Sequence, residues 1–146
     1  SEKEISSYWS KLSGPLLDRI DMYVETARVD LDKLQSSRKG ESSSSIRRKV
    51  EKARKIQEKR FKGREYSFNA EMPASDIEIF CTLGREERQL MELAYRNLQL
   101  SARTYHRVLK VARTIADLEG CEQIKKHHIA EALAYRLTER NHCNNG

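Results

Sequence analysis

The sequence predicts an all-α protein in which a helical bundle begins near residue 44. From that point apolar residues recur three and four positions apart, which is the period of an amphipathic helix. Serine, glutamate and glycine stand where helix caps are expected. Most connections between the predicted helices are short, and this favours antiparallel packing of neighbouring helices.

Residues 1–43 depart from this pattern. Only residues 21–29 have strand character, and one strand cannot form a sheet because both of its edges stay unpaired. We therefore expect residues 1–43 to be a loosely ordered remnant of a larger core whose other strands lie elsewhere. The serine-rich run that follows, "LQSSRKGESSSS", predicts a loop that ends in a helix N-cap near Ser44 or Ser45.

A long and very basic helix is predicted after this loop. Its apolar positions form a narrow stripe, so the helix can bury only one thin side. These positions are Ile46, Val50, Ala53 and Ile56. Between residues 47 and 64 ten side chains are basic and two are acidic, which gives a net charge of +8 in a chain whose total is +6. Such a surface favours anionic partners.

Two shorter helices are predicted next. Ser75 and Glu78 have the spacing of a capping box, which opens a short helix. Glu86 and Glu87 then open a helix that runs to about Leu98, because acidic residues stabilise the positive end of a helix dipole.

The last two helices carry most of the predicted core. One is capped by Ser101 and ends at Gly120, and the other spans residues 126–139. The inner faces of the helices after residue 85 predict a core of Leu90, Leu93, Tyr105, Val108, Leu109, Ala112, Ile115, Ile129 and Leu133.

The helix after Ser101 has its charges reversed with respect to its dipole. Arg103 and Arg107 lie near the positive N-terminal end, whereas Asp117 and Glu119 lie at the negative end. Two arginines one turn apart at a helix N-terminus could form a two-pronged phosphate site. The alternative is that both arginines are solvated or pair with glutamates of a neighbouring helix.

The basic helix could contact a nucleic-acid backbone through phosphates alone. The candidate residues are Arg47, Arg48, Lys49, Lys52, Arg54 and Lys55. The alternative is a solvated helix whose charges only keep the protein soluble, since no aromatic residues are interleaved with them for base stacking.

No metal site is expected, because the three cysteines are widely spaced and His127 and His128 are adjacent, pointing about 100° apart on a helix. The cysteines fit free thiols in a reducing cytosol. No apolar run approaches the roughly 18 residues of a membrane span, so we expect a cytoplasmic protein without a membrane partner. The chain also lacks a phosphate-binding loop, a nucleophile elbow and a zinc-protease motif, so no self-contained catalysis is expected.

Several long motifs resemble one family. The segments "LSGPLLDRID", "ESSSSIRRKVEKARKIQEKRF", "FNAEM" and "LQLSARTYHRVLKVARTIADLEG" resemble the C-terminal region of magnesium-chelatase-like AAA+ ATPases of the bacterial competence-associated helicase type. The resemblance runs from about residue 8 to residue 136. It implies a ring of neighbouring subunits that bind ATP and Mg²⁺ between them.

The resemblance also implies roles for single residues. Arg19, in "LLDRID", matches the arginine finger that reaches the γ-phosphate held by a neighbouring subunit. Arg103, in "LSARTYHR", matches the sensor-2 arginine of the helical lid, and Arg107 is a further nucleotide-contacting candidate. Arginine fingers stabilise the charge of the transferring phosphoryl group and are worth about 10³ to 10⁵ in rate.

The nucleotide-binding motifs of that family would lie upstream of Ser1. The resemblance therefore implies a remnant of the ATPase core at 1–43, a helical lid domain at 44–140 and a disordered tail at 141–146. On its own the chain is expected to be monomeric, to bind no nucleotide tightly and to catalyse nothing. The intact protein is expected to be an oligomeric motor acting on DNA. The alternative is a basic helical module that contacts DNA or a partner protein without a nucleotide role.

Overall fold

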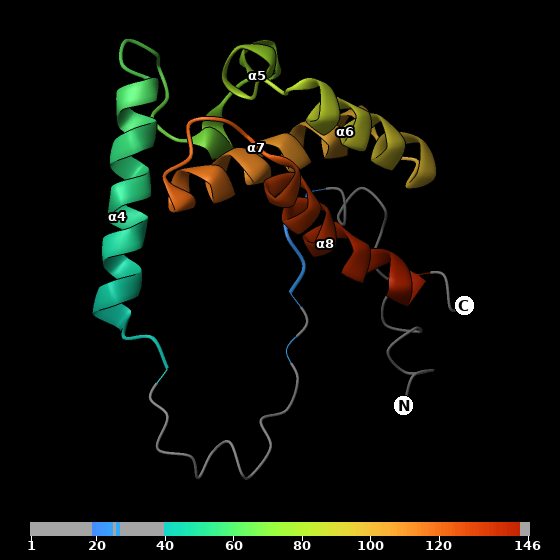
Figure 1. Cartoon of the computed structure of the whole chain (residues 1–146), viewed down its shortest axis with the longest axis horizontal. Helices are drawn as coiled ribbons and strands as arrows, with labels where there is room; N and C mark the ends of the chain where they lie inside the picture. The colour runs from blue at the N-terminus through green and yellow to red at the C-terminus, as the bar shows by residue number, and fades with distance from the viewer. Residues whose placement is uncertain (1–18, 25, 27–39, 144–146) are drawn as a thin grey trace, which may run out of the picture.

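A computed structural model describes residues 19–24, 26 and 40–143, with side chains as far as residue 136 (Figure 1). Its elements are α4 (Ser43–Arg60), the 3-10 helix η1 (Asn69–Glu71), α5 (Ala74–Phe80), α6 (Arg85–Asn97), α7 (Ala102–Glu119) and α8 (Lys126–Cys143). Among the described residues there is no strand, so the predicted all-α class is confirmed. None of the described helices has the length and apolar character needed to cross a membrane. The predictions for residues 1–18, 27–39 and 144–146 fall outside the described part of the chain.

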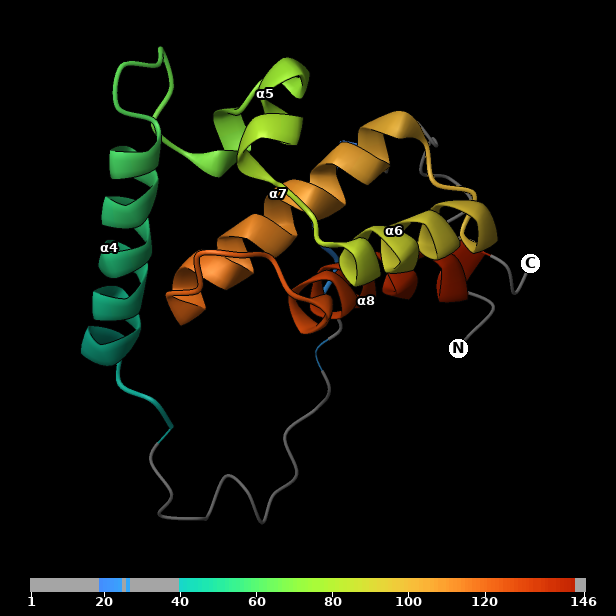
Figure 2. The same ribbon diagram turned by 45° about the horizontal axis from the view of Figure 1, so that its top comes forward.

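Helix α7 is the centre of the bundle (Figures 1 and 2). It contacts α8, α4, α5 and η1, while α6 lies against α8. This central place explains why apolar residues recur along the whole of α7, whereas the other helices need only one apolar face. The buried core consists of Phe61, Met72, Ile77, Cys81, Met91, Ala94, Val108, Leu109, Ala112, Ile115, Ile124, Ile129, Ala132 and Leu133.

The predicted core is confirmed except for three residues, two leucines of α6 and one tyrosine of α7. Leu90 and Tyr105 are half-buried and pack against the core, whereas Leu93 is 58% exposed, so its assignment to the core is wrong. The reason is that α6 buries only a narrow strip, in which Met91 and Ala94 fill the contact. Leu93 lies outside that strip.

Two of the predicted caps are confirmed and two are wrong. Ser101 caps α7 by accepting the N–H of Thr104 at 3.1 Å, and Gly120 ends the helix with φ +74°. The cap of α4 is Ser42 rather than Ser44 or Ser45. No capping box forms at the start of α5, because Pro73 takes the N-cap position and places Ser75 inside the helix.

Helix α4 is packed over only half of its length. Ala53 and Gln57 are buried in its second half, whereas Ile46 and Val50 in the first half are exposed. The first half of α4 therefore stands away from the rest of the bundle (Figure 2). The predicted apolar stripe continues along the helix, but only its C-terminal part has a described partner.

The described part of the predicted strand, residues 21–24 and 26, has no strand conformation. It is also attached to the bundle rather than loosely packed, because the backbone N–H of Tyr23 donates to the carbonyl of Tyr135 at 2.9 Å. A side chain of α8, Arg136, donates to the carbonyl of Ile20. No strand lies among the residues that the structure describes, and α8 satisfies these two backbone groups instead.

Candidate functional site

The N-terminal end of α7 presents an unbalanced positive charge. The first turn of α7 has no acidic residue, and Arg103 lies exposed there. No described residue makes an ion pair or hydrogen bond with the Arg103 side chain. Because the helix dipole is positive at this end, a bound anion would be stabilised by both the dipole and the guanidinium.

Arg107, one turn further along α7, has a partner from the N-terminal segment. Its Nε lies 3.2 Å from Oδ1 of Asp21, and its side chain is only 18% exposed. The Nη1 atom of Arg107 is buried and has no hydrogen-bond partner in the described structure. Arg107 thus pairs with an acidic residue, as in the structural alternative, but the acid is an aspartate of the preceding segment rather than a glutamate of a neighbouring helix.

Arg19 lies in an exposed turn, two residues before Asp21. No described residue pairs with it. The structure thus brings the Arg19 segment to α7 through Asp21 and Arg107, while the side chains of Arg19 and Arg103 themselves both stay exposed.

A small pocket lies beside this junction. It has a volume of about 330 Å³ and is lined on one side by Asp21 and Met22 and on the other by α7 residues that include Arg107 and Lys110. Burial lowers the pKa of Lys110, whose Nζ donates to the carbonyl of Ala70 at 3.0 Å. Arg107 and Lys110 both line the pocket on the side of α7, which places two basic groups there.

The acidic residues at the other end of α7 are held inside the protein. Asp117 is buried and accepts hydrogen bonds from both terminal nitrogens of Arg60, one of them at 2.7 Å. It also lies 3.2 Å from Nη2 of Arg113 and accepts from the side chain of Asn69 at 2.8 Å. Sequence reasoning missed this cluster, although the four-residue spacing of Arg113 and Asp117 on one helix is a signal for that pair.

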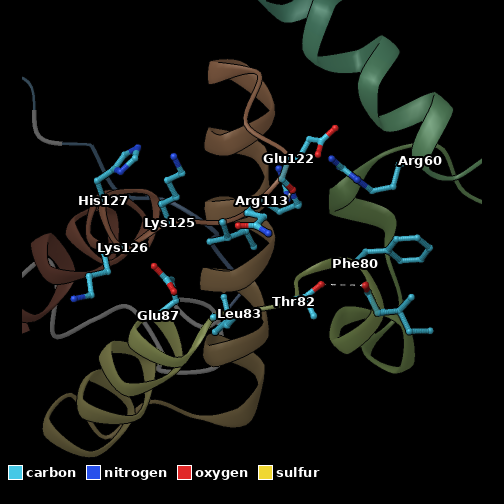
Figure 3. Close-up of a pocket in the computed structure, with 14 residues that line it drawn as sticks. Arg60, Phe80, Thr82, Leu83, Glu87, Arg113, Glu122, Lys125, Lys126 and His127 are labelled. Carbon is cyan, nitrogen blue, oxygen red and sulfur yellow. Dashed lines mark hydrogen bonds between the residues drawn. The ribbon is translucent and has the colours of Figure 1, made fainter.

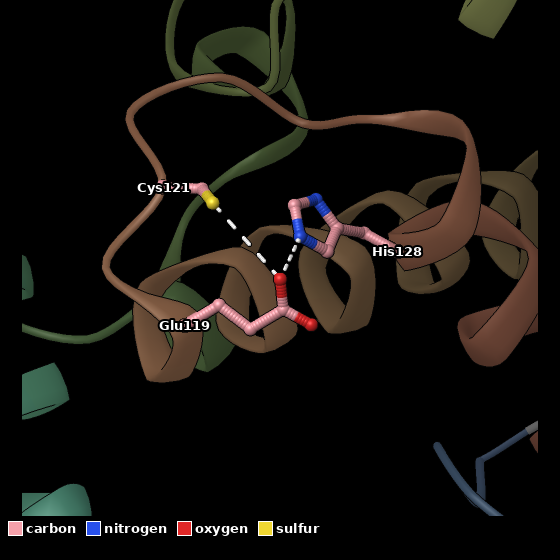
Figure 4. A group of neighbouring side chains, drawn as sticks. All are labelled: Glu119, Cys121 and His128. Atoms are coloured by element: carbon pink, nitrogen blue, oxygen red, sulfur yellow. Dashed lines mark hydrogen bonds and ion pairs between the residues drawn. The ribbon is translucent and has the colours of Figure 1, made fainter.

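Glu119 is shared by two histidines, as Figure 4 shows for one of them. Its Oε2 lies 3.0 Å from Nε2 of His127 and 2.9 Å from Nε2 of His128, although the two histidines are adjacent. These hydrogen bonds lower the pKa of the Glu119 carboxyl. The carboxylate at this end of α7 is therefore held by hydrogen bonds to residues at the start of α8.

Glu119, Cys121 and His128 bring three potential metal ligands within 4.8 Å of one another. His128 is fully buried, and its Nδ1 accepts the backbone N–H of Lys125 at 2.9 Å. The ring proton of a neutral His128 must then be on Nε2, where it is donated to Glu119. A metal ion at Nε2 would displace this proton, so the arrangement is that of a structural hydrogen-bond cluster.

A cleft of about 800 Å³ lies between the ends of α5 and α6 and the α7–α8 connection (Figure 3). Arg113 lines it but is occupied, since its Nη1 donates to the carbonyl of Glu122 at 2.7 Å and its Nη2 binds Asp117. Lys126, also in the lining, pairs with Glu86 at 2.8 Å. These groups act mainly to hold the α7–α8 connection in place.

The basic side chains predicted to contact a nucleic acid or a partner are all exposed on α4. They are Arg47, Arg48, Lys49, Lys52, Arg54 and Lys55. Only Lys49 has a described acidic partner, Glu41, at 2.7 Å, and both of these side chains are exposed. Such exposed pairs contribute little to stability, so the charge of α4 is available to a partner.

The described structure is a small helical domain in which one helix carries an exposed arginine at its N-terminal end and pairs a second arginine with the preceding segment. The family "Magnesium chelatase, subunit ChlI C-terminal" matches residues 40–136, which cover the described bundle. The chain belongs to this family. A second family, "Magnesium chelatase, subunit ChlI", matches residues 1–34. The resemblance identified in the sequence is thereby confirmed.

Several bacterial proteins are similar over nearly the whole chain. The competence protein ComM of Haemophilus influenzae is 43% identical over 141 residues, which are 96% of this chain and 27% of the relative. The uncharacterized protein YifB of Escherichia coli is 38% identical over 134 residues, 91% of this chain and 26% of the relative. The uncharacterized protein Rv2897c of Mycobacterium tuberculosis is 33% identical over 131 residues. The chain thus spans about a quarter of the length of these relatives.

Proposed function

We propose that this chain is the C-terminal lid region of a longer AAA+ ATPase that works as an oligomer with ATP and Mg²⁺. The observation that carries the proposal is the exposed Arg103 at the positive end of α7, where neither an acidic cap nor any other described residue balances it. In the proposed function Arg103 binds the terminal phosphate of the nucleotide held by its own subunit. The proposed domain organisation is a core remnant at 1–43 and the lid at 44–140; of the residues expected to form a disordered tail, 141–143 continue α8.

Arg19 is proposed to act on the nucleotide of the neighbouring subunit. Its exposed place in a turn, without a described partner, supports a role outside the lid. As an arginine finger it would neutralise charge that develops on the phosphoryl group during transfer.

The test is ATP hydrolysis by the longer protein that carries this chain. Arg19→Ala and Arg103→Ala should each lower kcat at least tenfold, as expected when a charge that stabilises the transition state is removed. The matched control is Arg96→Ala, which removes an exposed arginine from the last turn of α6. Unchanged hydrolysis in both variants would overturn the proposal.

A mixture of the two variants tests whether they act on different subunits. If Arg103 serves its own nucleotide and Arg19 the neighbour's, an Arg19→Ala subunit beside an Arg103→Ala subunit rebuilds a complete site. Random mixing at equal amounts should then restore about a quarter of the sites. No recovery above the separate variants would mean that Arg19 and Arg103 of one subunit act on the same nucleotide.

We propose α4 as the contact with a polyanion, for which DNA is the polymer to test. The six exposed basic residues on this helix support it, and the name of one relative as a competence protein points the same way. This contact would serve the motor, or, in the alternative function, a binding module without a nucleotide role.

The test is DNA binding as a function of salt. Replacing Arg47, Arg48 and Lys49 by Gln should weaken binding and make the slope of log K against log salt shallower by about 2 to 3, because fewer counterions are released. The control replaces Arg85, Arg88 and Arg96 of α6, which are also exposed. Equal losses in both triple variants would indicate an effect of net charge and contradict a role of α4.

A further inference from the structure

We infer that Asp21 and Arg136 clamp the Arg19 segment to the lid helices of the same chain and are positioning residues for Arg19. The inference rests on the proposed function of Arg19 as an arginine finger. What it adds is a mechanical link between that finger and α7, the helix that carries Arg103.

Helix α8 holds one side of the segment. Arg136 donates from Nη1 to the carbonyl of Ile20 at 2.5 Å, and its guanidinium lies 5.3 Å from the centre of the Tyr23 ring. The backbone N–H of Tyr23 donates to the carbonyl of Tyr135 at 2.9 Å. Arg136 is only 6% exposed, so its charge needs these partners to offset the cost of burial.

Helix α7 holds the other side. Oδ1 of Asp21 lies 3.2 Å from Nε of Arg107, and this arginine is largely buried against the bundle. Residues 20 and 23 are thus bound to α8, while residue 21 between them is bound to α7. Two helices hold a stretch of four residues, which fixes its direction as well as its position.

Arg19 directly precedes this clamped stretch, and Arg103 lies one turn before Arg107 on α7. A change in the orientation of α7 on binding nucleotide would therefore move Arg19 with it. Through this link, nucleotide bound by one subunit would set the position of the finger that serves the neighbouring subunit. The expected result is positive cooperativity between neighbouring sites, since both depend on the same rigid unit.

The clamp itself can be measured on the 146-residue chain by amide hydrogen exchange. The Tyr23 amide should exchange more slowly than an unprotected amide of the same sequence, and Arg136→Met should remove this protection. Asp21→Asn is the second variant, since Asp21 is exposed and its replacement should leave the bundle intact. Arg96→Met, on α6, is the control. Rapid exchange of Tyr23 in the unaltered chain, or protection that survives both substitutions, would overturn the clamp.

The coupling is measured by ATP hydrolysis of the longer protein. Asp21→Asn and Arg136→Met should lower kcat by roughly tenfold, because a misplaced catalytic group loses about that much or more. The Hill coefficient should fall to 1, while ATP affinity at low occupancy stays unchanged. Arg136→Lys can still donate to the Ile20 carbonyl, so it should recover part of the rate and of the cooperativity.

Two outcomes separate this inference from the proposed function. If Arg19→Ala abolishes hydrolysis while the clamp variants keep the kcat and Hill coefficient of the unaltered protein, the coupling is wrong and the finger stands. If Arg19→Ala leaves hydrolysis unchanged, the finger is wrong, and with it the coupling, even where exchange at Tyr23 shows the clamp.

Discussion

The two ends of α7 carry the same electrostatic anomaly with different outcomes. Each end has charges of the sign that the helix dipole disfavours: Arg103 and Arg107 near the N-terminus, Asp117 and Glu119 near the C-terminus. At the C-terminal end both acids are bound by basic groups of the same domain. At the N-terminal end Arg103 remains exposed without a described partner. A reversed charge is therefore structural where the fold supplies its partner and a candidate functional group where it does not.

Breaking the Asp117 cluster should have the largest effect on stability. Asp117→Asn removes the charge that Arg60 and Arg113 share and leaves two arginines without a counterion in a largely buried place. Removing one partner of a buried ion pair typically costs about 3 to 5 kcal/mol, measurable as a shift in urea unfolding. The control is Glu119→Gln, at the same end of α7 but outside the Asp117 cluster, where the carboxylate is 44% exposed and a smaller loss is expected. A loss below about 1 kcal/mol for Asp117→Asn would show that the cluster is not structural.

The reactivity of the Cys81 thiol reports on the region around Asp117. Burial raises the pKa of its thiol from 9.0 to about 11, with smaller influences from Arg113, Arg60 and Asp117. The folded state therefore keeps the thiol protonated, and this contribution to stability is complete below pH 9 and is lost as the pH rises through 11.

At pH 8 iodoacetamide should therefore alkylate the partly exposed Cys121 before the buried Cys81. Mass spectrometry of the two cysteine-containing peptides measures the two rates. Asp117→Asn should speed the alkylation of Cys81, because opening of the bundle exposes it. Equal rates for both thiols in the unaltered chain would contradict the burial of Cys81.

Changing the charge at the N-terminal end of α7 should have a small effect on stability, opposite in sign to the effect of Asp117→Asn. Arg103→Glu places a negative charge at the positive end of the helix and should raise the free energy of unfolding by about 0.3 to 1 kcal/mol. The matched control, Arg96→Glu in the last turn of α6, should lower it by a similar amount. A loss of stability in Arg103→Glu would mean that Arg103 has a structural partner, and the contrast between the two ends would fail.

Local signals predicted the helix boundaries best. Ser101 and Gly120 were correct as caps because the groups that they satisfy lie within a few residues along the chain. Ser75 was wrong as a cap, since Pro73 takes that position, and Leu93 was wrong as core, since α6 buries only the narrow strip of Met91 and Ala94. Periodicity identifies an apolar face, but it does not say how wide the partner's surface is.

The residues of the candidate site likewise divide into those that the sequence identified and those that it could not identify. The resemblance of "LLDRID" and "LSARTYHR" singled out Arg19 and Arg103, and their roles stay predictions. The partners of Asp21 and Arg136 could not be predicted, because 86 residues separate Asp21 from Arg107 and 116 separate Ile20 from Arg136. Charge alone does not identify the partner of a charged residue, because so polar a chain offers many residues of opposite charge.

The sequence by itself determined the helical class, the helices that carry most of the core, the basic character of α4 and the family. These properties depend on periodicity, on caps and on composition, all of which are local in the chain. Only the tertiary structure decided which charges are compensated, that half of α4 is left unpacked and that residues 20–23 are held by α7 and α8. Those outcomes depend on which side chains meet after the helices pack, and the energy of a charge is set by the burial and the partners that it finds there.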